Sequence, residues 1–200
     1  MILEIGQMNT GEILTEKIFN IHNKLGNDSP AFSEFRNKEI VKKEFFISRF
    51  ILDYFENLDS VTIIGSRFPI NYTMFLNSLG VDNITVIDYH PMLQKHKQHL
   101  NSKVIIKRPL FDNLNEYVID SDLVIFPNTE YLVPLKMLSY YKNCKNVVAV
   151  NHINMQHNFN NYRINNEYTF AEDCNLSSVE NFKVSFNSKC YMAYGTNTAL

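Results

Sequence analysis

The sequence has little of what three large classes of protein require. Its three cysteines (Cys144, Cys174 and Cys190) are widely spaced and form no C-x-x-C pair, which predicts reduced thiols rather than a disulfide framework or a zinc site. No run approaches 18 apolar residues, so no membrane-spanning helix is predicted. With 19 basic and 21 acidic residues, the net charge of −2 is unlike that of a protein whose affinity depends on neutralising nucleic-acid phosphates.

The first residues contain no basic stretch followed by an apolar one, which predicts that there is no secretory signal. Together with the reduced cysteines, this predicts a cytoplasmic protein with no membrane partner. A length of 200 residues is typical of one domain carrying a modest extension.

Residues 1–58 are predicted to form a helical extension. One apolar stripe has helical spacing and comprises Leu14, Ile18, Ile21 and Leu25. Ser29 and Pro30 are a typical start for a second helical stretch, which continues with interruption to about Asn57 and is rich in aromatic residues. We expect these helices to cover a cleft of the following domain or to form a homo-oligomer surface.

Residues 59–200 are predicted to form an α/β domain. Five short apolar runs are predicted strands: 61–65, 83–88, 103–106, 122–126 and 146–150. Helical segments at 72–79, 91–100 and 133–141 lie between them. Continuous Val/Ile runs of this kind indicate a parallel sheet covered by helices on both faces. Near the C-terminus, residues 182–186 and 190–194 flank Asn187-Ser188-Lys189, which predicts an antiparallel hairpin.

The segment after the first predicted strand bears on the class of cofactor. Ligands of open α/β sheets bind beyond the carboxyl ends of the strands. There Gly65, Ser66 and Arg67 precede Pro69, so the segment has a single glycine and one residue without an N–H. A dinucleotide would need several close backbone N–H groups for its pyrophosphate. The segment therefore favours a nucleoside without phosphate, with Gly65, Ser66 and Arg67 as candidate cofactor-binding residues, although Gly65 alone would also serve a tight turn.

Acidic and aromatic residues follow the next two predicted strands. Asp88 ends the second strand, 23 residues beyond Gly65, and Tyr89 follows it; both are candidate cofactor-binding residues, because a carboxylate at this position can accept hydrogen bonds from two ribose hydroxyls. Alternatively, Asp88 caps the helix that begins at Pro91. After the third strand, Phe111 and Asp112 would meet an adenine, or would be a core residue and a turn residue.

Four polar or aromatic residues follow the fourth predicted strand: Asn128, Thr129, Glu130 and Tyr131. Glu130 is placed to orient or deprotonate a substrate, and the Asn128 amide can both donate and accept a hydrogen bond. These four residues are the candidate catalytic group, and Asn128 is also a candidate cofactor-binding residue. The competing interpretation is that Asn128 or Thr129 caps the next helix, with Glu130 in its first turn.

The fifth predicted strand is followed by Asn151, His152, Asn154 and His157, which are candidate substrate-binding residues. In an extended chain, His152 and Asn154 lie on the same face and form one polar wall of a pocket. The two histidines are five residues apart and have no acidic or cysteine companion, so no metal site is predicted.

These strand-end residues resemble those of the class I S-adenosylmethionine-dependent methyltransferase superfamily. More narrowly, Asn128-Thr129-Glu130 resembles an Asn-Thr-Ser/Glu signature of small methyltransferase-like proteins from bacteriophages and environmental bacteria. The resemblance covers roughly residues 60–195 and implies a seven-stranded Rossmann-like sheet with S-adenosylmethionine as cofactor. It implies that Gly65 faces the methionine part, Asp88 the ribose, and Phe111 or Asp112 the adenine. Asn128, Thr129 and Glu130 would border the methyl-transfer site.

The sequence also departs from the superfamily pattern. Arg67 replaces the second glycine, and Ile63 and Ile64 stand where an acid usually precedes Gly65. The Asn-Pro-Pro-aromatic motif of amino-group DNA methyltransferases and the Pro-Cys nucleophile of cytosine-C5 enzymes are both missing, which disfavours nucleobase substrates.

Three functional hypotheses follow from this pattern. The first is a methyltransferase that acts on a small molecule or an exposed polar group. The second is an aminocarboxypropyl transferase that resembles nicotianamine synthases and uses the same cofactor. The third is a degenerate binding module without enzymatic activity, in which the long Arg67 side chain fills the cofactor cleft.

Overall fold

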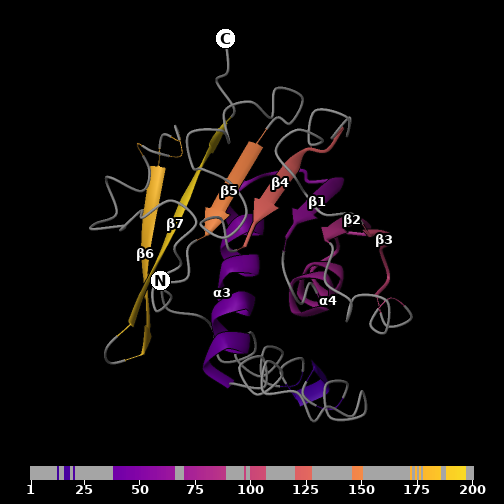
Figure 1. Cartoon of the computed structure of the whole chain (residues 1–200), viewed down its shortest axis with the longest axis horizontal. Helices are drawn as coiled ribbons and strands as arrows, with labels where there is room; N and C mark the ends of the chain where they lie inside the picture. Colours follow the sequence, from indigo (N-terminus) through magenta and orange to yellow (C-terminus); the bar gives the residue numbers. More distant parts are fainter. Residues whose placement is uncertain are drawn as a thin grey trace.

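A computed structural model of the chain describes residues 13, 16–18, 20, 38–65, 70–88, 97, 100–106, 120–127, 146–150, 172, 174, 176, 178–185 and 188–196. Within these residues, one seven-stranded sheet has the strand order β3-β2-β1-β4-β5-β7-β6 (Figure 1). The helices predicted at 91–100 and 133–141 fall largely outside this part of the chain.

The first five strands are parallel and the last two are antiparallel. The parallel strands are β1 (Ser60–Ile64), β2 (Asn83–Asp88), β3 (Lys103–Ile106), β4 (Leu123–Phe126) and β5 (Asn146–Val150). β7 (Ser188–Thr196) pairs antiparallel with β5 on one side and with β6 (Ser178–Ser185) on the other. The predicted mostly parallel, Rossmann-like sheet with a C-terminal antiparallel pair is confirmed.

The C-terminal hairpin is longer than the sequence predicts. Its first strand begins at Ser178 rather than at residue 182, and its second begins at Ser188, a residue that the sequence pattern assigns to the connection. The added residues are mostly polar because β6 pairs with only one neighbour and is an edge of the sheet. An edge strand tolerates polar side chains, so apolar patterning underestimates its length.

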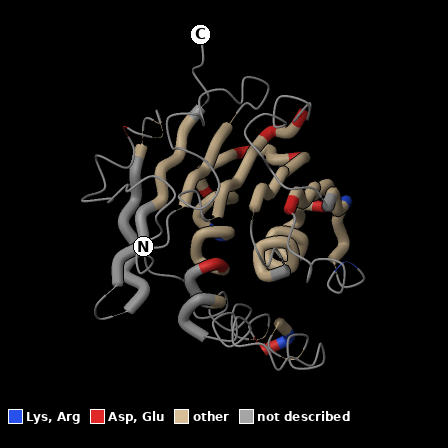
Figure 2. The backbone as a smooth tube through the Cα atoms, viewed as in Figure 1, with Lys and Arg blue, Asp and Glu red and all other residues tan. Residues whose placement is uncertain are grey.

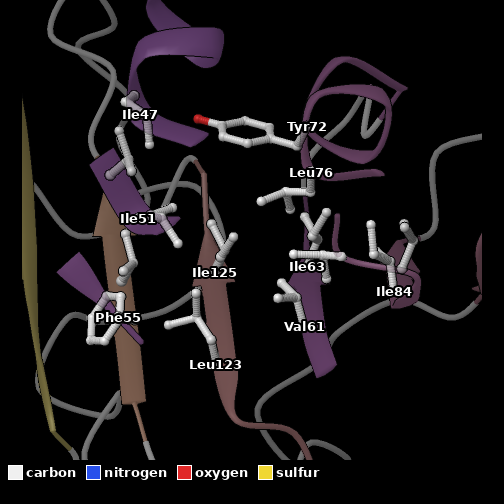
Figure 3. Close-up of a cluster of buried hydrophobic side chains, with 14 of the residues drawn as sticks. Ile47, Ile51, Phe55, Val61, Ile63, Tyr72, Leu76, Ile84, Leu123 and Ile125 are labelled. Atoms are coloured by element: carbon white, nitrogen blue, oxygen red, sulfur yellow. The ribbon is translucent and has the colours of Figure 1, made fainter. Parts of the chain in front are cut away.

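Helices α3 (Lys38–Tyr54) and α4 (Ile70–Ser78) pack on the sheet and share its main hydrophobic core. Figure 3 shows side chains of this core from both helices and the sheet: Ile47, Ile51, Phe55, Tyr72, Leu76, Val61, Ile63, Ile84, Leu123 and Ile125. The alternate residues of the central strands, such as Ile64, Val124 and Phe126, are buried as well. Both faces of the central sheet are therefore covered, as the apolar runs predicted.

The end of α4 shows how local sequence stops a helix. Gly80 has a φ of +101°, and its N–H donates to the carbonyl of Asn77, while the N–H of Val81 donates to the carbonyl of Leu76. This pair of bonds is a Schellman motif, in which a left-handed residue satisfies the last carbonyls of the helix. The predicted stop at Gly80 is confirmed.

A carboxylate ties together the amino ends of the central strands. Asp122, just before β4, accepts hydrogen bonds at Oδ2 from the N–H of Asp59 and from both the N–H and the hydroxyl of Ser60. Its own N–H donates to the Ser60 hydroxyl oxygen, and its carbonyl accepts from Asn146. The amino edge of the sheet is therefore held together by hydrogen bonds to Asp122 and Ser60.

Charge is nearly absent from the middle of the sheet. β1, β4 and β5 contain no charged residue along their lengths (Figure 2). Among the described residues, no helix is both long and apolar enough to cross a membrane. A charged side chain that lies buried near this sheet is therefore exceptional, and its burial has to be explained.

Candidate functional site

The carboxyl end of β1 lies where the order of the strands reverses. β1 is flanked by β2 on one side and by β4 on the other, although β4 comes much later in the chain. In an open α/β sheet, such a reversal is where ligands bind. The arrowheads of the parallel strands point toward the same edge (Figure 1), and α4 is the next helix after β1 in the chain.

Gly65 makes the bend that leads out of β1. It is buried and has a φ of +68°, in the left-handed region that residues with a side chain rarely adopt. Its N–H donates to the carbonyl oxygen of Ile87 at 2.8 Å, so the bend is attached to the end of β2. A glycine is needed here for its backbone conformation. The same bend places backbone that carries no side chain at the carboxyl edge of the sheet.

Asp88 is the last residue of β2 and follows the carbonyl that Gly65 contacts. Its side chain is only 1% exposed, at a depth where an ionised carboxylate requires compensating hydrogen bonds or charge. Asp88 pairs with Ile106, which is the last residue of the neighbouring strand β3. The structure therefore brings two predicted cofactor-binding residues, Gly65 and Asp88, to adjoining positions, while their binding roles stay predictions.

The other predicted site residues lie outside the described part of the chain. Those assigned to the cofactor are Ser66, Arg67, Tyr89, Phe111, Asp112 and Asn128, and those assigned to catalysis are Asn128, Thr129, Glu130 and Tyr131. Those assigned to the substrate are Asn151, His152, Asn154 and His157. The strands that precede them do end at the carboxyl edge, at Ile106, Phe126 and Val150.

Sequence reasoning missed a buried polar pair that joins α3 to α4. The Asn71 amide Nδ2 donates a hydrogen bond to Oε2 of Glu44, across 27 residues of chain. Asn71 is fully buried and Glu44 is 8% exposed. One turn further along α3, the buried Ser48 hydroxyl donates to the Glu44 carbonyl. The pair is a polar contact between two helices whose other buried residues are mostly apolar.

A signal for this pair is present in the sequence. Val41, Glu44, Ser48, Ile51 and Phe55 follow one another at helical spacing and are all buried. An acid and a hydroxyl on the apolar stripe of a helix are exceptions to the pattern. Such exceptions mark buried polar contacts, because unpaired polar groups are costly in a core.

The direction of α3 places the Glu44–Asn71 pair at the carboxyl edge of the sheet. In Figure 3, Ile47 lies at the level of Tyr72 and above Ile125, whereas Phe55 lies near the level of Leu123. Because Ile125 follows Leu123 in β4, α3 runs opposite to the strands. Glu44, nearly a turn before Ile47, therefore lies further toward the carboxyl edge.

Asn71 is likewise at this edge, because it is the second residue of α4 and follows the connection that starts at Gly65. Among the described residues, no group of three or more His, Cys, Asp or Glu side chains is arranged to hold a metal ion. The described site therefore consists of a backbone bend at Gly65, the buried Asp88 carboxylate and the buried Glu44–Asn71 pair.

No protein-family model and no curated protein matches the chain. Solved structures do resemble it. N-methyltransferase NodS from Bradyrhizobium japonicum, in complex with S-adenosyl-L-homocysteine, superposes with a TM-score of 0.57 at 15% identity, over 92% of this chain and 98% of NodS. The N-terminal domain of EvdMO1 with S-adenosylhomocysteine bound gives a TM-score of 0.55 at 9% identity, over 90% of this chain and 96% of that domain. The chain has the class I methyltransferase fold.

The class I methyltransferase fold is also shared by larger proteins. Spermidine synthase in complex with the transition-state analogue AdoDATO gives a TM-score of 0.52 at 9% identity, and the chain covers 62% of its length. A longer protein from Nostoc punctiforme is covered over 58% of its length. At these identities the likeness defines the fold, and the chemistry has to be argued from the residues of this chain.

Proposed function

We propose that this chain binds S-adenosylmethionine at the Gly65–Asp88 edge and is a methyltransferase for a small molecule or an exposed polar group. The observation that carries the proposal is the buried Asp88 carboxylate beside the Gly65 bend, at the reversal of the strand order. A carboxylate in this position can accept hydrogen bonds from two ribose hydroxyls. NodS and the EvdMO1 domain, which bind S-adenosylhomocysteine on this fold, support the same choice of ligand.

The chemistry of the connection after β1 supports a phosphate-free nucleoside. Between β1 and α4 the chain has one glycine, and Pro69 lacks an N–H. A pyrophosphate would need several backbone donors in this connection, whereas a nucleoside joined to a sulfonium needs only close approach of the backbone. Gly65, which has no side chain, allows that approach.

When bound, S-adenosylmethionine would supply a methyl group already activated by its sulfonium, so the protein has to bind, orient and deprotonate the acceptor. Asn128, Thr129, Glu130 and Tyr131 follow β4, whose neighbour is β1, and are the proposed acceptor side of the site. Glu130 would accept the proton that the nucleophile loses as the methyl group is transferred. Asn151, His152, Asn154 and His157 after β5 would bind the remainder of the acceptor.

Calorimetric titration with S-adenosylhomocysteine tests the binding half of the proposal. Asp88→Asn keeps the shape of the side chain but removes its charge, and we expect Kd to rise about 10- to 100-fold, since a hydrogen bond to a charged group is worth about 1.5–3 kcal/mol. Asp82→Asn makes the same change at an exposed residue just before the other end of β2 and should leave Kd unchanged. If the folded wild-type protein shows no binding at high micromolar ligand, the proposal is wrong.

Product analysis tests the transfer half. Incubation with S-adenosylmethionine and a panel of small nucleophiles should release S-adenosylhomocysteine, and Glu130→Gln should slow this release more than it weakens cofactor binding. Release of methylthioadenosine would instead indicate aminocarboxypropyl transfer. Binding without turnover of any acceptor would favour a binding module.

A further inference from the structure

Helix α3 carries an aromatic stripe in addition to the apolar side that enters the core. Phe46, Phe50 and Tyr54 follow one another at intervals of four residues and therefore share one side of the helix. Phe46 is 37% exposed and Tyr54 is 48% exposed, although both are large aromatic side chains. Ile47 and Ile51, which belong to the core, are fully buried on a different side of α3. The core therefore does not account for the exposed part of the aromatic stripe.

The C-terminal end of the aromatic stripe is held in place by other rings. Phe50 and Tyr54 stack with their centroids 5.8 Å apart and their planes 9° from parallel. Tyr54 also makes T-shaped contacts with Phe55 and with Tyr194 of β7, at centroid distances of 4.8 and 4.5 Å. A ring that is already packed loses little further conformational freedom when another surface binds it, so the stripe is suited to an interface.

A pair of opposite charges flanks the aromatic stripe. Arg49 Nη2 lies 3.0 Å from Asp53 Oδ1, and Arg49 Nε donates a hydrogen bond to Asp53 Oδ2 at 3.1 Å. The two side chains are 32% and 40% exposed, so another molecule can contact both. A partner with charges of one sign would meet repulsion as well as attraction here. The pair instead suits a partner that presents the same two charges in reverse order.

We propose that the chain forms a twofold-symmetric dimer in which the aromatic stripes of two α3 helices pack against each other in antiparallel orientation. A symmetry axis beside Phe50 places Phe46 of one copy near Tyr54 of the other, since each is four residues from the axis. Arg49 of one copy then lies about 3 Å along the helix axis from Asp53 of the other. The guanidinium has five N–H donors, so it can contact both Asp53 carboxylates at once.

This dimer goes beyond the proposed function and requires no ligand. A homo-oligomer surface is one of the two roles that the sequence predicts for the helices of residues 1–58. The stripe lies on a helix of 17 residues, which is about 25 Å long, so the contact is small for a protein interface. We therefore expect a dimer Kd in the micromolar range, which sedimentation equilibrium of the full chain between about 1 and 500 µM measures.

Charge reversal distinguishes a contact between two copies from a contact within one helix. Arg49→Asp puts two anions beside the aromatic stripe and Asp53→Arg puts two cations there, so each variant alone should have a dimer Kd at least about 10-fold above that of wild type. An equal mixture of the two variants should associate with a Kd within about threefold of wild type, because an anionic copy then faces a cationic one. Asp82→Arg reverses an exposed charge just before β2 and is the matched control, which should dimerise as wild type does.

Phe46→Ser tests the aromatic part of the contact and should also raise the dimer Kd at least about 10-fold. Thermal unfolding verifies that each variant is folded. A wild-type chain that stays monomeric at about 500 µM would overturn the proposal. A dimer that the charge reversals and Phe46→Ser leave intact would overturn it too, because the contact would then lie on another surface. A mixture of folded Arg49→Asp and Asp53→Arg that associates no better than either variant alone would overturn the antiparallel arrangement.

Discussion

Replacement of Gly65 by alanine tests whether the bend after β1 serves the fold, the ligand or both. Gly65 has a φ of +68°, and an L-residue in the left-handed region costs roughly 1–2 kcal/mol. For a chain of this length, such a loss lowers the midpoint of thermal unfolding by about 2–8 °C. The variant should therefore remain folded at room temperature, because native domains are typically stable by about 5–15 kcal/mol.

Ligand binding should respond more strongly to Gly65→Ala than stability does. A methyl group at Gly65 stands at the carboxyl edge, beside the end of β2 to which its N–H donates. If a nucleoside approaches this backbone closely, the methyl group takes up space that the ligand needs. We expect the Kd for S-adenosylhomocysteine to rise at least about 10-fold, which corresponds to about 1.4 kcal/mol.

Gly80→Ala is the matched control for the same substitution. Gly80 also has a positive φ, of +101°, and a Cβ added there meets no atom within 4 Å. Its cost is therefore backbone strain alone, at the far end of α4 from Gly65. Gly80→Ala should lower thermal stability but leave Kd unchanged. Equal ligand affinity in folded Gly65→Ala and in wild type would refute the placement of the ligand over this bend.

Three further substitutions test the framework around the site by urea unfolding. Asp122→Ala removes three hydrogen bonds to one carboxylate oxygen, and we expect a loss of about 2–4 kcal/mol, discounted for partial exposure; a loss below about 1 kcal/mol would contradict the role assigned to this edge. Ile51→Ala leaves a cavity in the shared core and should cost about 2–5 kcal/mol; an unchanged midpoint would show that α3 does not pack as described. Asp53→Ala breaks an exposed pair with Arg49 and should cost at most about 0.5 kcal/mol; a larger effect would reveal a structural role for that pair.

The parallel strands could be predicted closely because their signal is local. For β2, β3 and β5, the predicted bounds coincide with those observed, since each is a short run rich in Ile and Val that begins at a polar residue. Burial on both faces requires such runs, so their ends can be recognised without tertiary information. The edge strand β6 lacks this constraint, and its polar first half was missed.

The two parts of the candidate site also differ in how far they could be predicted from sequence. Gly65 and Asp88 could be found because each follows an apolar strand, and the topology of an α/β sheet brings strand ends together. Glu44 and Asn71 could not be paired from sequence, because their contact depends on how two helices pack across 27 residues of chain. Periodicity marks Glu44 as an exception on a buried stripe, but not which residue it meets.

The packing of α3 bears on how the chain is organised. The boundary predicted at residue 58 separates a helical extension from the sheet domain, and it stays a prediction. Ile47, Ile51 and Phe55 nevertheless belong to the same hydrophobic core as the central strands, so α3 is part of the structure that holds β1 and β4 in place. Because Glu44 lies on this same helix and accepts a hydrogen bond from Asn71 near the start of α4, a change in the packing of α3 would also disturb the start of α4 at the carboxyl edge. Stability and ligand affinity should therefore be coupled through α3, whereas the Asp122 contacts at the opposite edge should affect stability alone.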